Sequence, residues 1–178
     1  FETLQNTYTK NDNIMFAVEP KDGKVFTQKT LAIIEEITQA SWQIPYSIRV
    51  DSITNFQHTW SNLDDLVVQN LVENSLNFTD IQLQKVQTIA LSEPLLLNRL
   101  ITPSTNITGI NITINRPEKS ITETPEVVAF ARNMKNQFQK KYPEINIYLT
   151  GVVFMDNAFN EAGEGDMKSL VPFMYGIV

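Results

Sequence analysis

The chain contains no cysteine and only one histidine, His58, among its 178 residues. Without cysteine it can form no disulfide bond, thiol nucleophile or zinc–thiolate site. A single histidine cannot build a multi-histidine metal site, and any catalytic triad would depend on this one residue. His58 lies between Gln57 and Thr59 in a predicted loop. We therefore interpret it as an exposed polar residue and not as a catalytic one.

Positive charge is scarce as well. Fourteen Lys and Arg stand against twenty Asp and Glu, which gives a net charge of -6. The basic residues are scattered singly, apart from Lys140-Lys141. Nucleic-acid binding requires a clustered basic face, so the sequence predicts no nucleic-acid partner. The apolar share of 42% and the charged share of 19% are typical of a globular domain with a core.

Long apolar runs are also missing. No stretch reaches the roughly 18 to 20 consecutive apolar residues that a membrane-spanning helix needs. Residues 167–178 nevertheless become steadily more apolar, without the polar tail that commonly closes a helix. No signal-peptide pattern follows Phe1. We expect the chain to be a soluble segment of a longer protein, taken from between two membrane spans.

The acidic residues do not form a convincing reaction centre. Asp64-Asp65 precede a predicted strand, and adjacent strand residues point to opposite faces, so this pair is interpreted as a solvated loop end. The acidic residues within 161–166 superficially suggest a calcium loop, but their spacing is not that of the EF-hand. The sequence therefore predicts no catalytic residue, no cofactor and no bound metal ion.

A first strand-helix-strand unit is predicted at about 13–55. The apolar run 13–19 has the length of a strand and ends at a turn. Thr27 is a candidate N-cap for a helix whose apolar residues recur at helical spacing until Ile44-Pro45. Residues 46–54 then alternate with a period of two, which predicts a strand with one buried face.

A second unit of the same order is predicted at about 107–153. Ile110, Ile112 and Ile114 alternate with polar residues, and Thr124-Pro125 is predicted to start the following helix. A last strand is predicted from Ile145 to Val153. The apolar stripe of the helix consists of Val127, Phe130, Ala131, Met134 and Phe138. Such a stripe could line a lipid pocket, but at helical spacing it is more typical of a core.

The middle of the chain, about 64–101, is predicted to form a further unit. It contains a weak strand at 66–68, a helix opened by a capping box at Thr79 to Gln82, and a strand at 95–101. Residues 55–77 show no clear period. Two strand-helix-strand units that interlock predict an α+β fold of the ferredoxin-like type, an α/β sandwich with helices on one face of an antiparallel sheet.

Two stretches of this sequence resemble a known family. The first is Arg49-Val50-Asp51-Ser52-Ile53-Thr54-Asn55. The second is Leu149-Thr150-Gly151, followed by Asn157-Ala158-Phe159-Asn160-Glu161-Ala162 and then by Asp166 through Pro172. With the order of the elements, they resemble the first extracytoplasmic loop, between transmembrane helices 1 and 2, of resistance-nodulation-division (RND) exporters of the MMPL-like branch.

The resemblance implies that residues 1–156 form a periplasmic porter domain and that residues 157–178 form a connecting helix toward the second transmembrane span. The parent would be a proton-driven inner-membrane exporter of hydrophobic compounds or lipids, with its proton relay in membrane helices outside this chain. The implied partners are the remainder of the transporter, a hydrophobic or lipid substrate in transit, and a homo-oligomer or periplasmic proteins. Gly163 and Gly165 are predicted to form a hinge toward the membrane, because glycine lowers helix stiffness.

Two other classes of function are compatible with the sequence. A stand-alone ferredoxin-like module could hold a ligand between helix and sheet, or interact with a protein through a sheet edge. It predicts a polar natural C-terminus beyond Val178. A hydrolytic enzyme would need converging acid, base or nucleophile groups, and the sequence offers no such set.

Overall fold

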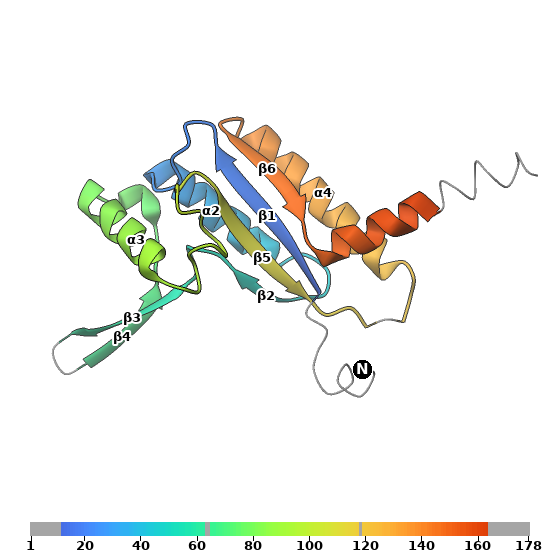
Figure 1. Cartoon of the computed structure of the whole chain (residues 1–178), viewed down its shortest axis with the longest axis horizontal. Helices are drawn as coiled ribbons and strands as arrows, with labels where there is room; N and C mark the ends of the chain where they lie inside the picture. The colour runs from blue at the N-terminus through green and yellow to red at the C-terminus, as the bar shows by residue number, and fades with distance from the viewer. Residues whose placement is uncertain (1–11, 63–64, 118, 164–178) are drawn as a thin grey trace, which may run out of the picture.

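The computed structural model describes residues 12–62, 65–117 and 119–163. In chain order the elements are β1 (Asp12–Pro20), α2 (Gln28–Ser41), β2 (Ser47–Asp51), β3 (Gln57–Asn62), β4 (Asp65–Asn70), η1 (Ser75–Asn77), α3 (Asp80–Ser92), β5 (Thr108–Ile114), α4 (Glu123–Lys141) and β6 (Ile145–Thr150). A further helical stretch at 152–163 follows β6 (Figure 1).

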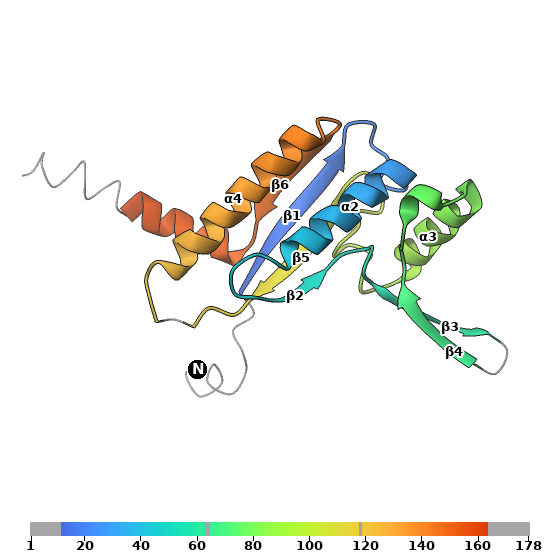
Figure 2. The same cartoon turned by 180° about the vertical axis from the view of Figure 1, so that it is seen from behind.

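The main sheet has four antiparallel strands in the order β2-β5-β1-β6. Helix α2 connects β1 to β2, and α4 connects β5 to β6, so two strand-helix-strand units interlock in one sheet. Both helices lie on the same face of this sheet (Figures 1 and 2). This is the ferredoxin-like α+β arrangement, and the predicted fold class is confirmed. The segment between β2 and β5 is inserted into that pattern.

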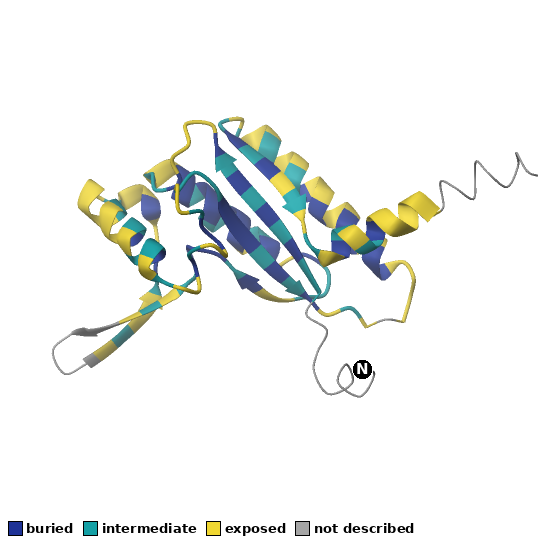
Figure 3. Ribbon diagram, viewed as in Figure 1, coloured by how far each residue is buried: buried dark blue, intermediate teal, exposed yellow. Residues whose placement is uncertain are grey.

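The core lies between the sheet and its two helices. Along β1, buried residues alternate with half-buried ones, because successive strand side chains point to opposite faces (Figure 3). The same alternation on β5 buries the three predicted isoleucines. Fully buried members of this core include Ile14, Phe16, Val18, Leu31, Ile34, Ile37, Ile110, Ile112, Ile114, Val127 and Ala131.

Helix α4 departs from its prediction in two ways. Its N-cap is Thr122 and not Thr124, so Pro125 falls within the first turn, where its missing N–H costs little. Phe130, predicted to be core, is 36% exposed, whereas Val128 is 1% exposed. The buried face of the helix is rotated toward Val128, so that the phenylalanine lies at its margin.

The predicted second and last strands are shorter than expected. Ile48 is half exposed, because the register of β2 shifts between Ser47 and Arg49. Such a bulge moves the side chains before it out of phase with those after it. Only Val50 of this strand is therefore buried, and β2 ends at Asp51 instead of continuing to residue 54. The last strand likewise ends at Thr150, before the predicted Val153.

The inserted segment differs most from the prediction. Strand β3 was not predicted, and it pairs with β4 in a two-stranded sheet that extends away from the main sheet (Figure 1). His58 therefore lies on a strand and not in a loop. Residues 95–101 are turns joined by isolated bridges, and not the predicted strand. Of the predicted elements here, β4 and α3 with its capping box at Thr79 are confirmed.

Candidate functional site

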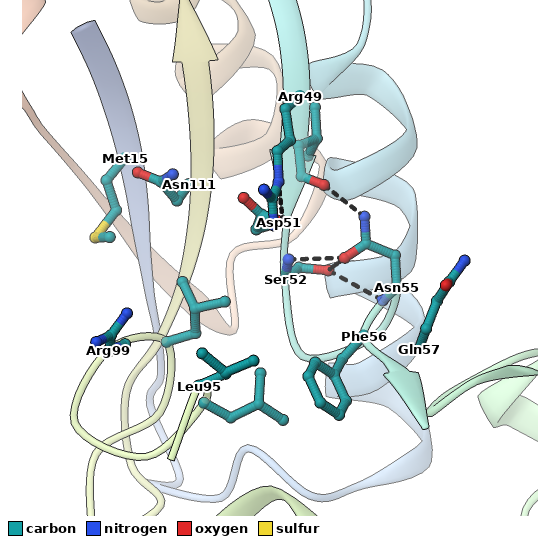
Figure 4. A pocket seen from close by; sticks show the side chains of 13 residues that line it. Met15, Arg49, Asp51, Ser52, Asn55, Phe56, Gln57, Leu95, Arg99 and Asn111 are labelled. Carbon is teal, nitrogen blue, oxygen red and sulfur yellow. Dashed lines mark hydrogen bonds and ion pairs between the residues drawn. The ribbon is translucent and has the colours of Figure 1, made fainter. Parts of the chain in front are cut away.

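A pocket of about 540 Å³ opens on the sheet face that the helices leave uncovered (Figure 4). Its floor includes Met15 of β1 and Asn111 of β5, whose neighbours in sequence point into the core. The inserted segment forms its walls, from the turn after β2 on one side and from residues 95–100 on the other. This volume lies within the roughly 300–1,000 Å³ of typical small-molecule sites.

The second wall is fixed to the start of β5. Asn98 adopts a left-handed conformation with φ 62°, which turns the chain back on itself. The carbonyl of Leu100 accepts hydrogen bonds from the N–H of Gly109 at 2.7 Å and from the hydroxyl of Thr108 at 2.8 Å. A Cβ on Gly109 would lie 3.3 Å from Met15 Sδ and 3.7 Å from a Leu100 methyl. A glycine at this position therefore leaves room for the side chains of Met15 and Leu100 over β5.

The turn after β2 forms the first wall, and it contains residues of the family-like stretch. Asn55 Oδ1 accepts from the N–H of Ser52 at 2.8 Å, and its Nδ2 donates to the Val50 carbonyl at 2.7 Å. The hydroxyls of Ser52 and Thr54 lie 2.8 Å apart, and both side chains are buried. Thr54 also lies 3.4 Å from Thr38 of α2. These polar residues therefore satisfy backbone groups and join the turn to the core.

The charged groups of the pocket are unevenly paired. Arg49 Nε donates to Asp51 Oδ1 at 2.8 Å. The Arg99 side chain makes no hydrogen bond or ion pair with any residue in the described part of the chain. Two arginines and one aspartate give the lining a net charge of +1. Beside these charges lie the apolar side chains of Met15, Phe56, Leu95, Leu96 and Leu100. The pocket thus combines an available cation with an apolar wall.

Thr150 and Gly151 do not line this pocket but connect β6 to the helix at 152–163. Gly151 has φ +122°, a conformation that side-chain-bearing residues rarely adopt. A Cβ there would collide with the backbone of β1, with Ile14 Cα only 2.8 Å away and the Asn13 carbonyl oxygen closer still. The Val152 N–H donates to Asn13 Oδ1 at 3.3 Å. This glycine therefore lets the chain reverse directly against β1.

The helix at 152–163 packs on the core through part of its surface and exposes other large apolar side chains. Val153 and Asn157 are buried, whereas Met155 is 60% exposed and Phe159 is 74% exposed. Glu161 pairs with Arg132 of α4 at 3.0 Å, and the ion pair lowers the pKa of Glu161. None of these residues reaches the pocket.

A half-buried arginine holds the start of this helix. Arg116 contacts Asp156 at 3.3 Å, and it also pairs with Asp12 at the start of β1. Burial acts to lower the pKa of Arg116, but its aspartate partners outweigh burial and raise the pKa. Gly163 is exposed, with nothing within 4 Å of a Cβ added there. Gly165, Asp166 and Pro172 lie outside the described residues.

Two further ionisable clusters lie away from the pocket. Lys141 and Tyr142 both donate to the carboxylate of Glu36, the former at 2.5 Å, and thereby join α4 to α2. Burial acts to raise the pKa of Glu36, but these two hydrogen bonds outweigh it and lower the pKa. On the uncovered sheet face, Tyr148 donates to Glu19 at 3.0 Å, which raises the pKa of Tyr148. Both clusters connect elements of the fold.

No protein-family model matches this sequence, and no curated protein matches it. Within residues 12–62, 65–117 and 119–163, no group of three acidic or histidine side chains is arranged to hold a metal ion. No helix in the same ranges is long and apolar enough to cross a membrane. The pocket is therefore identified from its geometry. Sequence reasoning missed Arg99, because a strand was predicted where the pocket wall lies.

Proposed function

We propose that this chain is the extracytoplasmic porter domain of a proton-driven RND-type inner-membrane exporter of hydrophobic compounds or lipids, and that it is not catalytic by itself. The observation that carries this proposal is the helix at 152–163. It continues directly from the last strand of a ferredoxin-like sheet and exposes Met155 and Phe159 to solvent. Met155 and Phe159 are four residues apart, so they lie on the same side of the helix. Large apolar side chains exposed together in this way indicate contact with another apolar surface.

The attachment of this helix supports a coupling role. Ion pairs from Arg116 to Asp156 and from Arg132 to Glu161 connect it to β1 and α4. A movement of the helix would therefore be transmitted to the sheet that carries the pocket. The sequence beyond residue 163 becomes more apolar, in keeping with a segment that leads toward a membrane. We propose Gly163 and Gly165 as the hinge of this connection.

The pocket favours a second candidate, a stand-alone ligand-binding module with a ferredoxin-like fold. Such a module needs no neighbouring membrane spans, whereas the exporter domain requires an apolar run of span length on each side in the coding sequence. The exporter domain therefore predicts that membrane spans are encoded on both sides of this segment, and the stand-alone module predicts that none is. An enzyme finds less support, because no acid, base and nucleophile converge in the pocket.

The exporter proposal is tested by efflux of a hydrophobic fluorescent dye from cells with the gene intact, deleted or restored. Deletion should increase dye retention, and a protonophore should abolish the difference. Restoration with the double variant Gly163→Ala/Gly165→Ala should give slower efflux than the wild type at equal protein level. Gln84→Ala, an exposed change on α3, is the matched control. Equal retention with and without the gene would contradict the proposal, and normal efflux by the double variant would contradict the hinge alone.

A further inference from the structure

We propose that the pocket between the uncovered sheet face and residues 95–100 binds an amphiphile with a single carboxylate head group and an aliphatic tail. Arg99 would bind the head group, and the apolar residues beside it would bind the tail. The inference rests on the proposed function where it takes this amphiphile to be the cargo, because it then names the class of substrate. The binding step itself is a property of the pocket.

The sign of the head group follows from the charges of the lining. The chain as a whole carries a net charge of -6, whereas the pocket lining carries +1. Asp51 already forms an ion pair with one of the two arginines, Arg49, at 2.8 Å. The guanidinium of Arg99 donates to no residue in the described part of the chain, and a planar guanidinium matches a carboxylate with two parallel hydrogen bonds. One negative charge neutralises the lining, whereas a second would be repelled by Asp51.

The aliphatic tail of the ligand is inferred from the apolar side chains that lie next to Arg99. Leu95 is 59% exposed although it lines a concave site, and Phe56 and Met15 are half-buried. In Figure 4, Leu95 lies between Arg99 and Phe56. An aliphatic chain that starts at the guanidinium can therefore cover exposed apolar surface as it extends, and each methylene group removed from water favours binding.

Size and rigidity agree with a small amphiphile. The pocket volume of about 540 Å³ is sufficient for a medium-chain acid. Both walls are fixed by hydrogen bonds, one through the Leu100 carbonyl and the other through the side chain of Asn55. Because the site is preformed, ligand binding requires little ordering of its loops and so loses little free energy to this cost.

The test is titration of the 178-residue chain with decanoate below its micelle concentration, followed by calorimetry and by amide chemical shifts. Decan-1-ol keeps the tail without the charge, decyltrimethylammonium reverses the charge, and acetate keeps the head group without the tail. Decanoate should bind at least tenfold more tightly than each of the other three. The shifts should be largest for residues 95–100 and for Asn111.

Two variants and a control locate the binding. Arg99→Gln should weaken decanoate binding at least tenfold and leave decan-1-ol binding unchanged. Leu95→Gln should weaken both ligands, and both substitutions replace exposed residues, so the fold should be retained. Lys24→Gln removes the same unit of charge from an exposed turn outside the pocket, and it should change neither. Equal affinity for decanoate and decan-1-ol, an unaffected Arg99→Gln variant, or shifts centred elsewhere would each overturn the proposal.

The outcome is separable from that of the proposed function. The protein could bind decanoate through Arg99 and yet not be part of a membrane exporter. That result would support the binding site and contradict its role as a cargo site. Failure of decanoate to bind to the domain of a demonstrated exporter would overturn this inference alone.

Discussion

Replacement of Gly151 by alanine tests how the last strand is connected to the helix that follows it. Gly151 has φ +122°, and a Cβ there would lie 2.8 Å from Ile14 Cα and even closer to the Asn13 carbonyl oxygen. Both atoms belong to the backbone of β1, the strand that is paired on both sides in the sheet. Neither atom can rotate away as the end of a flexible side chain could.

The expected cost has two parts. Holding alanine in a sparsely populated backbone region costs about 1–3 kcal/mol. Forcing an extra methyl group into a closely packed site costs about 1–3 kcal/mol. The free energy of unfolding should therefore fall by about 2–6 kcal/mol, a large part of the roughly 5–15 kcal/mol that a natural domain possesses.

The assay is urea unfolding of the 178-residue chain, with the midpoint and slope fitted for each variant. Gly163→Ala is the matched control, because nothing lies within 4 Å of the added Cβ and the residue is helical. It should leave stability unchanged or raise it by up to about 1 kcal/mol. A loss below about 1 kcal/mol in Gly151→Ala, with an unchanged slope, would refute the close approach of Gly151 to the backbone of β1.

Three further predictions concern stability. Thr79→Ala removes the capping box of α3 and should cost about 0.5–2 kcal/mol, whereas Thr88→Ala in the middle of the same helix should be nearly neutral; equal losses in denaturant would contradict the capping role. Ile112→Ala opens the fully buried core and should cost about 2–5 kcal/mol, clearly more than Phe130→Ala at its 36% exposed site, and the reverse order would show that the face of α4 is misplaced. The pKa of Glu36 is lowered in the folded state, so its carboxylate stabilises the fold above the ordinary glutamate pKa of about 4.3. This stabilisation is lost as the pH falls through the folded pKa. Glu36→Gln should therefore lose less stability than the wild type between pH 6 and pH 3, as measured by denaturant unfolding at each pH.

Most of the α+β framework could be predicted from the sequence, because its signals are local. Alternating isoleucines identify β5, and Thr27 and Thr79 begin α2 and α3 as N-caps. Each of these patterns reflects a single physical requirement, either one buried face or one satisfied helix end. Such requirements persist in the folded chain unless a neighbouring element overrides them.

The pocket could not be predicted, because its parts meet only through tertiary contacts. Leu95 to Ile101 is apolar enough for a strand, but the left-handed turn at Asn98 folds it onto β5 instead. The bulge that exposes Ile48 depends on how β2 pairs with β5. The burial of Val128 in place of Phe130 depends on the rotation of α4 against the sheet. Arg99 became a candidate site residue only when the loop and the sheet were seen together.

The central claim, that this domain lies on the outer side of the inner membrane as part of an exporter, is tested most directly by cysteine labelling. The chain has no cysteine of its own, so Lys24→Cys places a single thiol in an exposed turn. In intact cells expressing the parent protein, a maleimide that cannot cross the inner membrane should label this variant in the membrane fraction, and should not label the unsubstituted domain. Labelling that appears only after the inner membrane is permeabilised, or a labelled protein found only in the soluble fraction, would contradict the account.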